Sequence, residues 1–375
     1  MTTPAFEQGP IRPPSEAHSL LVRVIRNCTW NRCTFCPVYK GARSSLRSLD
    51  EVLADVDAMA AAAGVLRADG VSAIRAGAVP QEAYQVALFL QDGARTVFLQ
   101  DADPCAVKPE MLAAVVRRVR ECFLTVERVT TYGRASTLAR RTPEQLALLV
   151  DAGLSRVHLG LESGADEVLM AIDKGCTAGD LVAAGEKVVR AGLELCFYLM
   201  PGLGGRAAAA VHVAGSAGVI RAVAAAAPAE RPLVVRLRTA AVVPGTPLAE
   251  REAAGEFVLP DDVEVALELR ELLQAVGDAR FELRSDHALN LLPGLEGSLP
   301  SDRGRLLAML HEFLALPRLE QARYAVGARL GIYRRLADRD DAQRRDMLEE
   351  QFGSYREPSA DELLQAATAL RARFL

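Results

Sequence analysis

Three cysteines lie within nine residues of one segment and are the side chains best suited to chemistry. Cys28, Cys33 and Cys36 follow the short apolar run Leu20–Ile25. Thiolates are soft ligands that suit zinc and iron–sulfur clusters. A structural zinc site needs four ligands, and no second cysteine pair or nearby histidine completes such a set. We therefore expect the thiols to hold three irons of a [4Fe–4S] cluster and to leave the fourth open. A zinc loop that borrows a distant ligand is the alternative.

This loop resembles the cluster loop of radical S-adenosylmethionine (SAM) enzymes, whose usual spacing is Cys-x3-Cys-x2-Cys with an aromatic residue before the last cysteine. Phe35 occupies the aromatic place. Four residues, 29–32, separate the first two cysteines, so the spacing here is Cys-x4-Cys-x2-Cys. Loops accept an extra residue more readily than strands do. The resemblance covers roughly residues 18–300 and is nearest to the branch of oxygen-independent coproporphyrinogen oxidase, elongator and methylthiotransferase enzymes.

The resemblance implies two cofactors, a [4Fe–4S] cluster and SAM, and it assigns an acid to the SAM amino group. Asp103, in the turn Gln100–Pro104, matches that acid. Asp101 and Ala102 replace the two glycines of the family's turn, so the backbone approach to methionine differs. An aspartate that only caps the following helix near Pro104 is the alternative.

A second candidate acid, Glu162, lies in the segment Leu159–Gly164. Gly160 lets a ligand approach the backbone closely, and the resemblance implies that Glu162 accepts hydrogen bonds from ribose hydroxyls. A carboxylate at an apolar strand end is costly to bury alone, so the alternative is a structural Glu162 paired with Lys174. His158 lies on the same strand, and we interpret it as a core histidine.

Glycine-rich turns supply the remaining cofactor candidates. Gly202 and Gly204 lie in Met200–Gly205, which resembles the adenine-supporting turn of radical SAM enzymes, although glycine is common in turns of every function. Val243–Leu248 resembles the Pro-Gly-Thr-Pro turn of the elongator-like branch and is equally consistent with a rigid turn. Four polar residues are candidates for a substrate pocket: Tyr132, Arg134, Arg238 and His287.

Six short apolar runs, each followed by a helical pattern, predict an α/β fold with a parallel sheet. The predicted strands are Leu20–Ile25, Thr96–Leu99, Arg128–Thr131, Val157–Leu161, Leu195–Met200 and Leu233–Thr239. Six units fall short of a closed eight-unit barrel. The resemblance implies a partial (β/α)6 TIM-like barrel, and a doubly wound sheet is the alternative. The carboxyl ends of parallel strands are where such folds carry their chemistry.

We expect four regions along the chain. Residues 1–17 form an irregular lead-in, 18–280 the radical SAM core, 281–300 an ordered polar loop, and 301–375 a helical extension that packs on the barrel. The polar loop carries His287 among apolar residues, so we expect it either to cover a substrate pocket or to staple the C-terminal helices to the core.

Composition limits the class of protein. The net charge of −4 and pI near 5.9 give no electrostatic footprint for nucleic acid. The N-terminus lacks the order of a signal peptide, and no run of about 18 uncharged apolar residues is apparent. We expect a soluble cytoplasmic protein with no membrane and no nucleic-acid partner. Four further cysteines, Cys105, Cys122, Cys176 and Cys196, are far apart and are interpreted as buried small residues, with a second cluster as the alternative.

The resemblance implies an oxygen-sensitive radical SAM enzyme that cleaves SAM reductively, and we expect it to act on an unidentified small molecule. It would need an electron donor such as flavodoxin or ferredoxin. Two alternatives remain: a non-catalytic iron–sulfur redox or regulatory protein, and, within the family, an RNA-modifying or methyl(thio)transferase-type enzyme.

Overall fold

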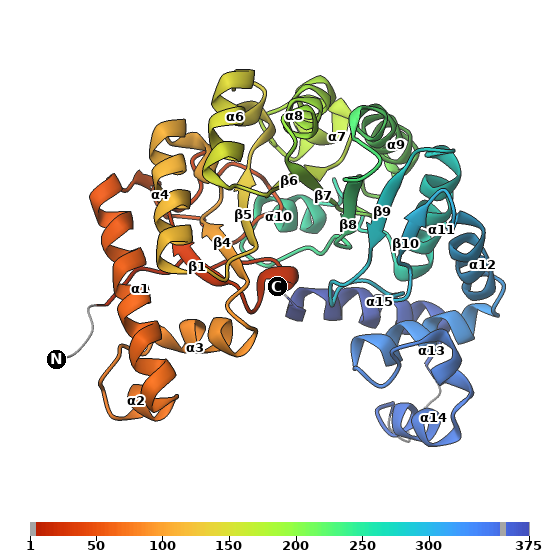
Figure 1. Cartoon of the computed structure of the whole chain (residues 1–375). Helices are drawn as coiled ribbons and strands as arrows, with labels where there is room; N and C mark the ends of the chain where they lie inside the picture. Colours follow the sequence, from red (N-terminus) through yellow and green to blue (C-terminus); the bar gives the residue numbers. More distant parts are fainter. Residues whose placement is uncertain (1–4, 353–357, 375) are drawn as a thin grey trace. The chain divides into compact units, whose positions relative to one another are not determined.

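The computed structural model describes residues 5–352 and 358–374 (Figure 1). The chain forms two compact units. The first comprises Met1–Asn31, Val38–Gly160 and Ala183–Cys196, and the second comprises Arg32–Pro37, Leu161–Val182 and Phe197–Leu375. The cysteine loop is therefore shared, because Cys28 belongs to the first unit and both Cys33 and Cys36 belong to the second.

Eight strands are hydrogen-bonded in the order β1-β4-β5-β6-β7-β8-β9-β10. Their bounds are β1 Leu20–Arg23, β4 Thr96–Gln100, β5 Arg128–Gly133, β6 Arg156–Glu162, β7 Glu194–Leu199, β8 Leu233–Leu237, β9 Phe281–Arg284 and β10 Gly297–Leu299. The pairs β1–β4, β4–β5, β5–β6 and β8–β9 are parallel, and β9–β10 is antiparallel. The predicted α/β class is confirmed, and within the described residues the sheet does not close into a complete barrel.

All six predicted strands are present, and their ends agree to within two residues. The first strand ends at Arg23, earlier than predicted, because Ile25–Arg26 (β2) leaves the sheet and pairs with Ser45–Leu46 (β3). The prediction missed β9 and β10, since residues 281–300 were expected to be loop throughout. Four- and three-residue strands are too short for alternation to identify.

Helices follow the strands, as the pattern predicts. Their bounds are α1 Leu49–Asp69, α2 Ser72–Arg75, α3 Ala83–Gln91, α4 Pro109–Cys122, α5 Ala135–Leu138, α6 Pro143–Ala152, α7 Asp166–Ala171, α8 Ala178–Arg190, α9 Ala209–Ala226, α10 Pro247–Ala253 and α11 Asp262–Ala275. In the first unit α1, α4 and α6 lie side by side (Figure 1). Capping boxes at Ser48 and Thr142 begin α1 and α6. Helix α1 continues through Gly64 to Asp69.

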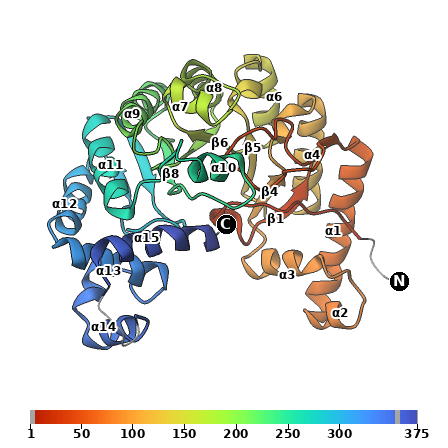
Figure 2. The same cartoon turned by 180° about the vertical axis from the view of Figure 1, so that it is seen from behind.

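The C-terminal part of the second unit is helical. It contains α12 Arg303–Leu314, α13 Arg318–Arg329, α14 Ala342–Glu349 and α15 Ala360–Leu370, and α13 packs along α15 (Figure 2). A capping box at Ser359 begins α15. These helices bury apolar faces, for example Leu306, Leu310 and Phe313 of α12.

One helix of the second unit is unusually apolar. By length and composition α9, Ala209–Ala226, is apolar enough to cross a membrane. The same features are found in buried helices of soluble folds, and α9 packs against α11 through buried residues such as Ile220 and Val223. The composition of α9 therefore fits a helix that covers the sheet.

Candidate functional site

The first half of the cysteine loop is held by asparagines of the first unit. Asn27 and Asn31 have positive φ angles of 64° and 49°, a conformation that asparagine tolerates better than most residues. The Asn31 N–H donates to Sγ of Cys28 at 3.3 Å. Its side-chain Nδ2 donates to the carbonyl of Tyr39 at 2.6 Å. The Cys28 thiol therefore lies in a turn whose shape is fixed by hydrogen bonds.

The second half of the loop is built into the second unit. The Thr34 N–H donates to the Ile172 carbonyl at 2.9 Å, and the Thr34 carbonyl accepts from the Leu248 N–H at 3.0 Å. Phe35 packs against a buried apolar cluster. That cluster consists of Ile172, Met200, Leu203, Ala240, Leu248, Phe257 and Leu259. Cys33 and Cys36 are thereby tied to the turn that follows β7, because Met200 and Leu203 belong to it.

The thiols differ in exposure. None of the seven cysteines forms a disulfide. Cys28, Cys33 and Cys36 are half-buried, as are Cys122 and Cys176, whereas Cys105 and Cys196 are buried. The prediction of buried small residues is thus correct for two of the four remaining cysteines and wrong for Cys122 and Cys176. Within residues 5–352 and 358–374, no group of three or more His, Cys, Asp or Glu side chains is placed to hold a metal ion.

Asp103 lies at the carboxyl end of β4 and is 1% exposed. Its Oδ1 accepts from the N–H of Arg134 at 3.1 Å, and its Oδ2 accepts from Thr137 Oγ1 at 2.6 Å. Burial raises the pKa of Asp103 against the lowering effect of these hydrogen bonds. The alternative that Asp103 caps the helical turn after Pro104 is wrong, because its side chain makes no such bond. It holds the start of α5 instead.

Glu162 ends β6 in a left-handed conformation, with φ 55°. Its Oε1 accepts from Lys174 Nζ at 2.8 Å, which is the pairing that the structural alternative requires. Burial disfavours the charged ammonium, but the charges of Glu162 and Cys33 and the hydrogen bond outweigh burial and raise the pKa of Lys174. Glu162 and Cys33 therefore lie close enough to act on the same ammonium. Gly160 lies two residues earlier in β6 and is half-buried.

Two glycines of the turn after β7 occupy positions where a side chain would be unfavourable. Gly202 has φ 87°, and a Cβ on Gly204 would lie 3.0 Å from the Ala208 carbonyl oxygen and from His212 Cβ. The Gly202 N–H donates to Glu268 Oε1 at 2.9 Å. Beside this turn lies a cavity of about 540 Å³, within the range of ligand pockets. Its lining includes Ile172, Leu203, Gly204, Gly205, Leu248 and Phe257.

The turn after β8 is rigid, as one interpretation of Val243–Leu248 requires. Gly245 has φ 81°. The Thr246 hydroxyl accepts from the Ala249 N–H at 3.3 Å and so caps α10. Thr246 is buried, and the positive φ of Gly245 together with this side-chain cap accounts for the motif as a turn.

Each unit contains two of the four substrate candidates. In the first unit, the Tyr132 ring packs edge-on against Phe98 with 4.9 Å between centroids. The Arg134 guanidinium lies 4.9 Å from the centroid of the Trp30 ring, inside the cysteine loop. In the second unit, burial, followed by the charge of Arg238, lowers the pKa of His287 to about 4.

Histidine 158 behaves as the core residue that the sequence predicts. It is fully buried, its ring lies 5.9 Å from the Tyr132 ring, and its Nε2 lies 3.9 Å from Glu16 Oε1. Its polar contact is therefore an acid of the N-terminal segment.

The polar residues between β9 and β10 have local partners. Asn290 Oδ1 accepts from the Thr239 N–H at 3.0 Å, and its Nδ2 donates to the Leu237 carbonyl at 2.8 Å. Ser285 Oγ donates to the Leu292 carbonyl at 2.9 Å. His287 Nδ1 accepts from the Leu289 N–H at 3.1 Å. The Asn290 bonds fasten the segment to the end of β8, whereas the Ser285 and His287 bonds lie within the segment.

One family model matches part of the sequence. Residues 78–211 match the model described as the Radical SAM superfamily. The match runs from α3 through β4, β5, β6 and β7 to the start of α9. It includes Asp103, Glu162 and the glycine turn, and it leaves the cysteine loop outside.

Several solved structures of the radical SAM superfamily are similar. The methyltransferase TsrM from Kitasatospora setae, solved with cobalamin and a [4Fe–4S] cluster bound, is 17% identical, with 93% of this chain and 65% of that chain covered and a TM-score of 0.46. HemN from Escherichia coli, a coproporphyrinogen III oxidase, is 16% identical, with 69% and 52% covered and a TM-score of 0.43. The chain spans about half the length of other matched structures. No curated protein matches the sequence. Likenesses this distant support no statement about activity.

Radical SAM enzymes bind a [4Fe–4S] cluster and SAM, and the donors in this chain fit the cluster in kind. Three half-buried thiols lie on one loop, and a backbone N–H donates to one of them. Hydrogen bonds to sulfur are among the features that tune such clusters. Cys28, Cys33 and Cys36 would be the residues that hold it.

The sequence did not reveal a buried relay of three polar side chains, of which the first lies within the matched residues 78–211 and the other two follow them. Ser163 Oγ lies 2.8 Å from His212 Nδ1, and His212 Nε2 lies 3.3 Å from Glu268 Oε1. All three side chains are buried. Because Glu268 also accepts from Gly202, the relay ties the end of β6 to the glycine turn. No spacing in the sequence indicates it, since the residues lie on three separate elements.

Proposed function

We propose that this chain is a radical SAM enzyme whose [4Fe–4S] cluster is held by Cys28, Cys33 and Cys36. The observation that carries the proposal is the family match over residues 78–211, in a chain whose three clustered thiols precede it. When bound, cluster and SAM together supply one-electron reductive cleavage of SAM to methionine and a 5′-deoxyadenosyl radical, which takes a hydrogen atom from the substrate.

The residues of the second unit support a shared site for cluster and cofactor. Lys174 is within electrostatic reach of both Cys33 and Glu162, and Phe35 packs against the apolar cluster that contains Met200 and Leu203. The ion pair with Lys174 uses one of the two carboxylate oxygens of Glu162. We assign the other oxygen to ribose hydroxyls, because a carboxylate accepts several hydrogen bonds.

The remaining assignments follow the resemblance. Asp103 is assigned to the SAM amino group, and Gly202 and Gly204 to the adenine, where absent side chains permit close approach. Tyr132, Arg134, Arg238 and His287 are assigned to the substrate, a small molecule. An electron donor such as flavodoxin or ferredoxin supplies the electron. The protein orients the reactants and excludes water and oxygen.

Anaerobic reconstitution with iron and sulfide tests the proposal. We expect about four irons per chain, as cubane clusters contain, and 5′-deoxyadenosine after addition of SAM and dithionite. Replacing Cys28, Cys33 or Cys36 by Ala should abolish iron binding, whereas Cys122→Ala and Cys176→Ala, which also change half-buried thiols, should retain it. Zinc in place of iron would refute the assignment, and iron lost from the control variants would reveal a second cluster.

A non-catalytic iron–sulfur redox or regulatory protein is the second candidate. Asp103 and Glu162 both have structural partners, Arg134 with Thr137 and Lys174 respectively, and this favours it. Such a protein would bind iron and fail to bind SAM. Equilibrium dialysis with SAM on the reconstituted protein therefore separates the two.

A further inference from the structure

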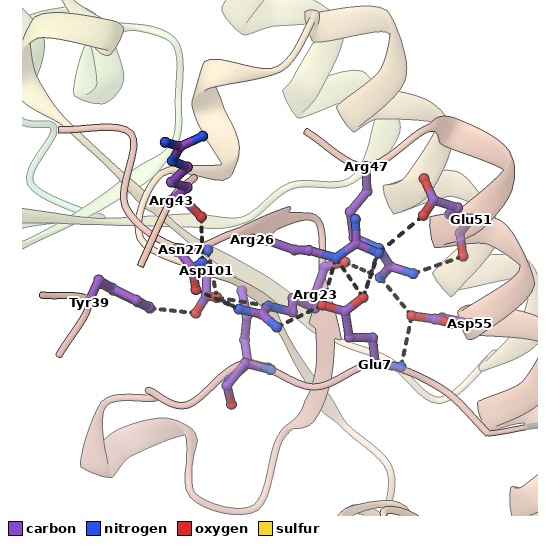
Figure 3. Close-up of polar contacts among 12 residues, drawn as sticks. Glu7, Arg23, Arg26, Asn27, Tyr39, Arg43, Arg47, Glu51, Asp55 and Asp101 are labelled. Atoms are coloured by element: carbon purple, nitrogen blue, oxygen red, sulfur yellow. Dashed lines mark hydrogen bonds and ion pairs between the residues drawn. The ribbon is translucent and has the colours of Figure 1, made fainter. Parts of the chain in front are cut away.

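A buried carboxylate sits at the base of the cysteine loop in the first unit. Asp101 is fully buried at the carboxyl end of β4. Its Oδ2 accepts from Arg23 Nε at 2.9 Å and from the Asn27 N–H at 3.3 Å. Its Oδ1 accepts from the Tyr39 hydroxyl at 2.6 Å. Figure 3 shows these side chains converging on the carboxylate from separate segments.

Two of the contacts of Asp101, those from Asn27 and Tyr39, come from the flanks of the cysteine loop. Asn27 directly precedes Cys28, and Tyr39 follows Cys36 by three residues. One carboxylate thus binds the chain immediately before the first cysteine and shortly after the last. Burial, followed by the charge of Asp101, raises the pKa of Tyr39, so the phenol keeps its proton and donates.

The charge of Asp101 is balanced by a fixed arginine. Arg23 Nη2 lies 2.7 Å from Asp101 Oδ2, and Arg23 Nη1 lies 2.7 Å from Glu7 Oε1. Glu7 also pairs with Arg26 at 2.7 Å and with Arg47 at 3.6 Å. These ion pairs draw residues of the N-terminal segment onto β1 and β2 (Figure 3).

Backbone of the same segment closes over the carboxylate. A Cβ added at Gly9 would lie 2.5 Å from Asp101 Oδ1, so only glycine fits there. The Gly9 N–H donates to Gln100 Oε1 at 2.9 Å. Water is thereby kept from a charged group, and in such a setting a hydrogen bond is strong and its loss is costly.

We propose that Asp101 is a positioning residue that clamps both flanks of the cysteine loop and so fixes the loop before any cluster binds. The resemblance expects glycine at this position, which could not make these contacts. The consequence for cluster retention rests on the proposed function, whereas the clamping of the loop does not.

Hydrogen exchange on the metal-free, reduced protein tests the clamp directly. The amides of Asn27, Asn31 and Ala42 have acceptors in the first unit, namely Asp101 Oδ2, Cys28 Sγ and the Tyr39 carbonyl. Asp101→Asn keeps the volume but places an NH2 group against donors. We expect exchange in peptides that cover these amides to accelerate about tenfold or more, while α4 is unchanged. Tyr39→Phe, which removes one hydroxyl, should give a smaller acceleration of the same peptides.

Asp103→Asn is the matched control, because it changes a buried acid two residues away that contacts α5 instead of the loop. Loop exchange in this variant should equal that of the wild type. Equal exchange in wild type, Asp101→Asn and Tyr39→Phe would overturn the clamp. Should Asp101→Asn fail to fold, Tyr39→Phe alone decides.

A second readout addresses the cluster. In reconstituted protein, Asp101→Asn should release iron to a chelator about tenfold faster than the wild type. If the wild type binds no iron, the proposed function fails while the exchange result still judges the clamp. Accelerated exchange with unchanged iron release would show that Asp101 orders the loop only in the metal-free protein, and it would refute a role of Asp101 in retaining the cluster.

Discussion

Replacing Asp262 by Asn should cost the protein far more stability than its size suggests. Asp262 Oδ1 forms an ion pair with Arg371 Nη2 at 2.9 Å and accepts a hydrogen bond from Arg329. All three side chains are at most 1% exposed. The cluster thus buries two positive charges on one negative charge. Removing the charge of one partner from a buried pair costs about 3–5 kcal/mol, because the remaining ion is left without compensation.

Two further variants test whether the uncompensated charge, and not the substitution itself, causes the loss of stability in Asp262→Asn. Arg371→Met removes the second cation and leaves the Asp262–Arg329 pair neutral, so its cost should be about 2 kcal/mol or less, since no buried charge is left uncompensated. Asp261→Asn makes the same chemical change one residue earlier. Its partner Arg318 is 49% exposed, and asparagine caps helices as well as aspartate does, so we expect a loss below about 1 kcal/mol.

Urea unfolding of the metal-free proteins measures the loss of stability in each variant. The transition midpoint should fall most for Asp262→Asn, less for Arg371→Met and least for Asp261→Asn. Burial alone would raise the pKa of Asp262, but the charges of Arg371 and Arg329 outweigh it and hold this pKa below the ordinary value of 3.8. A carboxyl whose folded pKa is lowered stabilises above its unfolded pKa and loses that contribution as the pH falls through the folded one. The difference in free energy of unfolding between wild type and Asp262→Asn should therefore be largest above about pH 4 and become smaller below it. Equal losses for Asp262→Asn and Arg371→Met would refute the charge argument.

Three shorter predictions concern the second unit. His287 should stabilise the fold above pH 6.5 and lose this contribution as the pH falls toward 4, because its folded pKa of about 4 lies below the ordinary 6.5. Wild type should then lose up to about 3 kcal/mol relative to His287→Asn, less any solvent screening, and parallel pH curves of the two proteins would contradict this. His212→Ala should cost about 1–3 kcal/mol for each partner left unsatisfied, Ser163 and Glu268, measured by urea unfolding; a loss below about 0.5 kcal/mol would exclude a working relay. Glu162→Ala should retain iron and weaken SAM binding by about 1–3 kcal/mol, and wild-type affinity in calorimetry would make the residue purely structural.

The fold was predictable because its signals are local. Runs such as Thr96–Leu99 and Val157–Leu161 are buried on both faces, and the capping boxes at Ser48 and Thr142 use residues three apart. Patterns of that range are carried by neighbouring residues and survive in the folded chain. Strand β9 was missed because its four residues alternate too briefly to be distinguished from a loop.

Positions of candidate residues were predictable, but their partners were not. Parallel strands predict that Asp103 and Glu162 follow strand ends, and the structure places both there. The sequence suggested Lys174 as a cation for Glu162 because it lies only 12 residues away. It gave no indication of Thr137 for Asp103, 34 residues away, since the side-chain contact depends on how two adjacent strand ends pack.

The two departures from the family's pattern are physically connected. The cysteine loop is one residue longer than usual between Cys28 and Cys33, and Asp101 replaces a glycine after β4. A longer loop has more conformations to lose when it is ordered, so an additional tether at its base offsets part of that entropy. Asp101 supplies such a tether through Asn27 and Tyr39. From sequence alone each departure counts against the assignment, whereas together they describe one loop that is longer and more firmly anchored.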